Sequence, residues 1–144
     1  MKGDSLINVE KYPQYQLYKF TRKLYVNKES LVPENCDNRC VYSTIINRCY
    51  YSSYLYLSEW LLNKGFKVKS KDDCEIDGEI FVSEHKQIRD ALKNEGESKI
   101  SNRLYKLSEL RSIADYEPFS DLTDDDLNRA INLMEYIFKE ISIT

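Results

Sequence analysis

The chain of 144 residues has few of the residues that make tight turns, with 4 glycines and 3 prolines. An all-β sandwich needs many such turns, so this scarcity argues against that class. The chain has one histidine, His85, which excludes mechanisms that need two histidines from the same chain. Its four cysteines form no CxxC pair and no cluster with histidine, so we expect reduced thiols, no metal and no other cofactor.

Charge and hydrophobic runs exclude further classes. The net charge of -3 means that the chain as a whole is not an electrostatic nucleic-acid binder, so any RNA contact needs a local basic patch. No apolar run reaches the roughly 18–20 residues of a membrane span, and the first residues lack the apolar core of a signal peptide. We therefore expect a cytoplasmic protein without membrane association. Glycine-rich phosphate loops, GxSxG and HExxH are also missing.

The length and a composition of 42% hydrophobic and 31% charged residues fit one globular domain, residues 1–144. Apolar residues recur at helical spacing and predict helices over residues 15–26, 38–64, 84–94, 102–114 and 124–141. The predicted fold is all-α, an up-and-down bundle of about five helices. Residues 67–82 alternate like strands around an acidic stretch, and we expect a short hairpin or a mobile loop there.

The predicted helix at 38–64 is apolar or aromatic on more than one face, which is typical of a central helix with several neighbours. Gly65 fits the position that ends it. Its apolar arc is wider than five helices cover, so we expect a homodimer. At other helix starts, Ser83 and Ser101 are predicted N-caps, and Thr123 with Asp126 has the spacing of a capping box.

Arg111 is the first candidate for chemistry, because it lies within the apolar stripe of its helix, four residues after Leu107. A guanidinium there needs a carboxylate, a carbonyl or a phosphate as its partner. Asp115, four residues further on, offers a purely structural pair. The functional alternative is an arginine that binds phosphate in a cleft.

Three other residues have a structural and a functional interpretation each. Arg48 lies in the middle of the aromatic helix, where it can form an ion pair or contact RNA. His85 lies in the first turn of its helix, and it can serve as a general base only if the fold brings it near Arg111. Tyr50 lies in the 38–64 helix with Tyr51, Tyr54 and Tyr56, where packing and base stacking are the alternatives.

Two segments have an order of residues that, taken together, is familiar. One is RCYYSSYLYL, beginning at Arg48, and the other is LYKLSELRSIADY, from Leu104 to Tyr116. Their order and spacing resemble the HEPN superfamily, in particular small stand-alone proteins often encoded beside minimal nucleotidyltransferases. The resemblance extends over roughly residues 37–141.

This resemblance implies an up-and-down helical bundle that is usually dimeric. Many members are metal-independent ribonucleases or toxins whose site combines an arginine with a histidine four to six residues later. Here Arg111 matches the arginine, but Tyr116 stands where the histidine is expected. A phenol is a weak base at neutral pH, so Asp115, Tyr116 or His85 would have to substitute. The catalytic candidates are therefore these four residues, and the RNA-binding candidates are Arg48, Arg103 and Tyr50.

Two functions from different classes follow. The first is a HEPN-like protein that targets RNA, as a metal-independent endoribonuclease or toxin of a toxin–antitoxin or defence system. The alternative is a non-catalytic helical interaction module that dimerises and binds a protein partner, such as a nucleotidyltransferase or an antitoxin. The missing histidine and the negative net charge favour this alternative. A nucleotide-binding bundle is a third hypothesis, although the sequence has no dedicated phosphate cradle.

Overall fold

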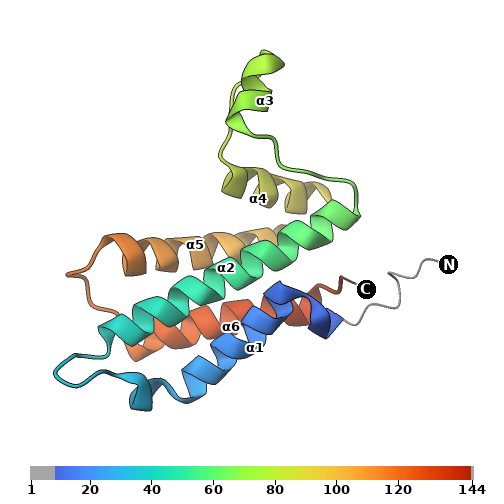
Figure 1. The fold of residues 1–144 in the computed structure, drawn as a ribbon. Helices are drawn as coiled ribbons and strands as arrows, with labels where there is room; N and C mark the ends of the chain where they lie inside the picture. The colour runs from blue at the N-terminus through green and yellow to red at the C-terminus, as the bar shows by residue number, and fades with distance from the viewer. Residues whose placement is uncertain (1–8, 144) are drawn as a thin grey trace.

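The computed structural model describes residues 9–143 and contains helices but no strand within them. Its α-helices are α1 (Pro13–Val26), α2 (Arg39–Asn63), α3 (Lys71–Ile76), α4 (Glu84–Asn94), α5 (Ser98–Tyr116) and α6 (Asp124–Glu140). Short 3-10 turns at Val9–Lys11 and Lys28–Leu31 flank α1. Five of these helices pack side by side, which confirms the predicted all-α bundle (Figure 1).

Helix α2 is the centre of the bundle, as its wide apolar arc predicts. It packs against α1, α4, α5 and α6, and its buried residues lie on several faces. The helix ends at Asn63, and Gly65 follows its C-cap as predicted, with a φ of 90°, a left-handed conformation that favours glycine. The backbone N–H of Phe66 donates to the carbonyl of Leu61 and closes the turn.

Helix α6 begins with the predicted capping box. The Asp126 backbone N–H donates to Thr123 Oγ1 at 3.1 Å, and the Thr123 N–H donates to Asp126 Oδ2 at 3.0 Å. Such reciprocal caps satisfy amide groups that have no partner within the helix. The apolar stripe that follows lies in the core, with residues Leu127, Ala130, Ile131, Met134, Ile137 and Phe138 buried.

Two helices start more than one residue before the predicted position. Helix α1 starts at Pro13, a residue well suited to the first helical position. Helix α5 starts at Ser98, so Ser101 is not an N-cap but a buried residue inside the helix. Its hydroxyl donates to the Arg89 carbonyl at 2.9 Å. The same hydroxyl chemistry that suits a cap therefore joins α5 to α4.

Of the two expectations for residues 67–82, a short hairpin or a mobile loop, the hairpin is wrong, because this segment contains the short helix α3 and no strand. The Ser70 hydroxyl accepts the Asp73 N–H at 3.1 Å, and acidic residues in the first turn suit the positive end of a helix. No other described element packs against α3, which extends beyond α4 (Figure 1). The Gln87 amide holds the flanking segments by donating to the carbonyls of Lys69 and Val82 at 2.9 and 2.7 Å.

Opposite charges in this segment pair locally, as the sequence indicates. The Lys69 ammonium contacts the carboxylates of both Asp77 and Glu79.

Within residues 9–143 no helix combines the length and the apolarity that crossing a bilayer requires.

Candidate functional site

The guanidinium of Arg111 lies between α5 and α2, and its side chain is 19% exposed. Its Nη2 donates to the Tyr51 hydroxyl at 2.6 Å and to the Tyr116 hydroxyl at 3.4 Å. Its Nε lies 3.1 Å from Asp115 Oδ2, so the predicted i,i+4 ion pair is present. The buried Nε makes no directed hydrogen bond, however. The carboxylate therefore balances the charge of the guanidinium without satisfying this buried donor.

Three tyrosine rings surround the same guanidinium. Its central carbon lies 5.1 Å from the Tyr51 ring centroid, 5.3 Å from that of Tyr116 and 5.7 Å from that of Tyr50. Cation–π contacts of this kind hold an arginine in place and restrict its rotamers. The site therefore presents a fixed positive charge at its partly exposed edge.

His85 contacts two of these tyrosines, Tyr50 and Tyr51. The Ser83 hydroxyl caps α4 by accepting the Lys86 N–H at 3.3 Å, which confirms the predicted cap and fixes the turn that carries His85. The imidazole stacks on Tyr54 at 4.5 Å between ring centroids, and its Nδ1 shares a hydrogen bond with the Tyr50 hydroxyl. Tyr50 is 1% exposed, so this partner fixes the imidazole from inside the bundle.

The fold brings His85 near Arg111, which was the condition for a role as a base. The Tyr51 hydroxyl binds Arg111, and the centroid of the Tyr51 ring lies 6.4 Å from that of the imidazole. Burial lowers the pKa of His85 below its ordinary value, and the charges of Arg111 and Arg89 lower it further. The carboxylate of Glu84 has the opposite, smaller effect. His85 is therefore neutral at pH 7, the form that can accept a proton.

Burial also raises the pKa of Tyr50, so its hydroxyl stays neutral beside the imidazole. A neutral hydroxyl can either donate to Nδ1 or accept a hydrogen from it. The contact thus fixes the orientation of the ring under both tautomers.

Asp115 and Arg48 join this cluster through Asn47. The Asn47 amide nitrogen donates to Asp115 Oδ2 at 2.8 Å, and Arg48 Nε donates to Asn47 Oδ1 at 3.0 Å. The Arg48 guanidinium also lies 5.9 Å from the Tyr51 ring centroid. A polar chain therefore runs along the surface from Arg48 to Arg111.

Arg103 is the one sequence candidate that the fold separates from the others. Its guanidinium lies 3.7 Å from the Tyr136 ring centroid, at the contact of α5 with α6, and donates to the Lys99 carbonyl at 3.3 Å. Tyr50 belongs to the cluster, but its ring is enclosed by protein and contacts His85, Tyr51 and Tyr54. Base stacking on Tyr50 finds no support in this geometry.

Sequence reasoning missed Arg39, which fixes the end of α5. Its guanidinium donates to four carbonyls, those of Ile113, Ala114, Glu117 and Ser120, at 3.3, 3.3, 2.6 and 2.8 Å. The last carbonyls of a helix have no partner within it, so this arginine caps the turn that carries Asp115 and Tyr116. Nothing in the local sequence distinguishes Arg39 from a solvated arginine.

Arg89 is the second residue that sequence reasoning missed. It follows His85 by four residues in α4, and its charge lowers the pKa of both His85 and Tyr50. The spacing of four could have suggested it, because residues at i and i+4 lie on the same side of a helix. Among the described residues, no group of three or more metal-ligating side chains lies together.

The architecture defines a helical bundle in which tyrosines of the central helix α2 contact both Arg111 of α5 and His85 of α4. The family model for the HEPN domain matches residues 34–143, and the chain belongs to this family. No curated protein and no solved structure matches the chain.

Proposed function

We propose that this HEPN-domain protein binds RNA at Arg111 and cleaves it without a metal, as part of a cytoplasmic toxin–antitoxin or defence system. The observation that carries the proposal is the position of a neutral His85 beside the aromatic enclosure of Arg111. An arginine fixed beside a neutral imidazole combines an anion site with a proton acceptor. Both groups come from one protomer.

The reaction that fits these groups is attack of a ribose 2′-oxygen on the adjacent phosphate. The O2′–P bond forms, the P–O5′ bond breaks, and the products are a 2′,3′-cyclic phosphate and a 5′-hydroxyl. His85 takes the proton from O2′, and the Tyr116 hydroxyl gives its proton to O5′. Water then returns a proton from His85 to Tyr116. Arg111 stabilises the negative charge on the phosphate oxygens.

This role assigns the tautomer of His85. A general base needs a lone pair directed at the substrate, and Nδ1 faces the Tyr50 hydroxyl. The imidazole must therefore carry its hydrogen on Nδ1, donated to the Tyr50 oxygen, with the Nε2 lone pair directed outward. Tyr50 is then a positioning residue that acts through His85.

The test compares RNA cleavage in EDTA by the wild type, Arg111→Ala and Arg129→Ala. Arg129 is an exposed arginine of α6 and serves as the matched control for loss of one positive charge. We expect Arg111→Ala to lose at least about a hundredfold in rate, the usual effect of removing a group that stabilises transition-state charge. Equal cleavage by all three proteins would contradict the proposed site.

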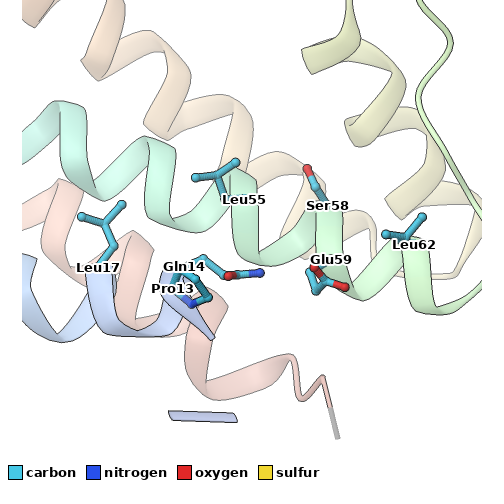
Figure 2. A pocket seen from close by; sticks show the side chains of 7 residues that line it. All are labelled: Pro13, Gln14, Leu17, Leu55, Ser58, Glu59 and Leu62. Carbon is cyan, nitrogen blue, oxygen red and sulfur yellow. The ribbon is translucent and has the colours of Figure 1, made fainter. Parts of the chain in front are cut away.

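Homodimerisation is part of the proposal, and an apolar groove between α1 and α2 is the surface that favours it. Figure 2 shows its lining, in which Leu17, Leu55 and Leu62 are prominent, and the groove has a volume of about 490 Å³. A second copy fits this surface because Leu55 and Leu62 are 46% and 52% exposed, and a two-fold contact would cover these leucines on both protomers at once. Light scattering of Leu55→Glu should give the monomer mass, and a wild-type monomer would refute the dimer.

The alternative function, a non-catalytic interaction module, is favoured by the segment around α3. Ile76 and Ile80 are 81% and 91% exposed, an unusual surface for apolar side chains in a part of the chain that packs against little else. A nucleotidyltransferase or an antitoxin protein would cover them. Co-purification of such a partner with the wild type, and its loss with Ile76→Asp/Ile80→Asp, would support this function. Retention of the partner by the double variant would count against it.

A further inference from the structure

A second groove lies between α4 and α5, next to the Arg111 site. It has a volume of about 240 Å³, and its lining is polar: Lys86, Arg89, Asp90, Lys93, Ser101, Asn102 and Tyr105. Three of these side chains are cationic and one is acidic, so the lining has a net charge of +2 in a chain whose net charge is -3. Lys86 Nζ pairs with Asp90 Oδ2 at 2.8 Å, which assigns the carboxylate to Lys86 rather than to Arg89 or Lys93.

Arg89 and Tyr105 give this groove a planar wall. The Arg89 guanidinium lies 5.0 Å from the Tyr105 ring centroid, and Tyr105 is 48% exposed. The Ser101 hydroxyl binds the Arg89 carbonyl and joins the two helices at this point. Guanidinium planes and aromatic rings are the surfaces on which unpaired bases stack, and the guanidinium edge remains able to bind phosphate.

Arg89 links the groove to the proposed reaction site, because it lines the groove and lies in the same helix as His85. Arg89 lies about one helical turn after His85, a rise of about 6 Å along α4 at 1.5 Å per residue. The charge of Arg89 acts on the His85 imidazole and on Tyr50, as does that of Arg111. One RNA strand can therefore contact Arg111 and Arg89 together.

We propose that the α4–α5 groove binds the nucleotide next to the scissile phosphate of a single-stranded RNA. Arg89 and Lys93 bind its phosphate, the Arg89–Tyr105 pair stacks its base, and Asn102 binds the edge of that base. Single strands fit because stacking on protein requires a base that is not already paired and stacked in a duplex. This inference rests on the proposed function, since it extends the RNA site of Arg111.

The test measures binding of a fluorescent eight-nucleotide single-stranded RNA whose 2′-hydroxyls are methylated, so that it is not cleaved. We expect Arg89→Ala/Lys93→Ala to weaken binding by at least about tenfold and to reduce the slope of log K against log salt by about 0.7, because the two side chains neutralise one phosphate of a single strand. We expect Tyr105→Ala to weaken binding by about tenfold and Tyr105→Phe to retain it, because the ring provides the stacking. Arg129→Ala is the matched control, and circular dichroism confirms folding of each variant.

The outcomes separate failure of the groove from failure of the proposed function. If Arg111→Ala abolishes cleavage while the groove variants bind RNA like the wild type, the groove proposal is wrong and the function stands. If neither Arg111→Ala nor the groove variants alter binding or cleavage, the proposed function itself is wrong. If Tyr105→Ala weakens binding of duplex and single-stranded RNA equally, base stacking in the groove is refuted.

Discussion

Replacing Tyr50 by Phe tests the link between the bundle core and His85. The change removes one hydroxyl from a side chain that is 1% exposed and leaves the ring stacking on the imidazole intact. The half-buried His85 Nδ1 loses the Tyr50 hydroxyl, its one hydrogen-bond partner within residues 9–143. A lost hydrogen bond costs about 0.5–1.5 kcal/mol, and an unsatisfied buried partner costs about 1–3 kcal/mol. Because water can reach a half-buried imidazole, we expect destabilisation near the lower end, about 1–2 kcal/mol.

Two assays check this prediction. Urea unfolding gives the free energy difference, with Tyr116→Phe as the control, because the same atom is lost there from a side chain that is 67% exposed. We expect the control to change stability by less than about 0.5 kcal/mol. Long-range ¹H–¹⁵N NMR of the imidazole gives the tautomer, and since His85 is the one histidine of the chain its signals need no assignment.

We expect the hydrogen on Nδ1 in the wild type and on Nε2 in Tyr50→Phe, where Nδ1 has lost its acceptor. A wild-type imidazole with its hydrogen on Nε2 would refute the reasoning, because Nε2 could not then accept a proton from substrate. Equal stability of Tyr50→Phe and the wild type would refute the energetic part.

The remaining predictions concern stability and its dependence on pH. Arg39→Met should cost about 2–3 kcal/mol in urea unfolding and speed amide exchange in the last turn of α5, because four carbonyls lose a charged donor; an unchanged midpoint would contradict this. The lowered pKa of His85 means that the unfolded chain binds its proton first, so wild-type stability should fall as pH drops below about 6.5, and His85→Gln should flatten that fall. The Asp124 carboxylate, which accepts the Tyr42 hydroxyl, raises the pKa of Tyr42 to about 12, so stability should be lost as pH rises from 10 through this value, and an identical alkaline profile for Tyr42→Phe would exclude the contribution.

Most of the fold was predictable from apolar residues that recur at helical spacing and from local capping residues. The extent of α2 and the stripe of α6 follow from spacing within one helix, and the Thr123–Asp126 box depends on residues three apart. The segment containing α3 was misread because alternating lysines imitate a strand, whereas the Ser70 cap and the acidic turn after it favour a helix. Ser101 was misread because a hydroxyl that caps one helix can equally bind the backbone of another.

The site was predictable only where it is local. The Arg111–Asp115 pair is an i,i+4 contact and could be read from spacing. The approach of His85 to Arg111 depends on how α4 and α5 pack on α2. The sequence alone therefore does not predict that these two residues lie close together. Arg39 was missed because its partners are backbone carbonyls on another element, which no local pattern reveals. Arg89 was missed although its spacing of four from His85 is local, because its contact with the Tyr105 ring depends on the packing of α4 against α5.

The most direct test of the central claim is the chemistry of RNA ends after incubation in EDTA with the wild type, Arg111→Ala and His85→Gln. The account predicts 2′,3′-cyclic phosphate and 5′-hydroxyl ends with the wild type, and a loss of at least about a hundredfold in their rate of formation with each variant. Intact RNA with a folded wild type, or ends formed equally by His85→Gln, would contradict the proposed mechanism.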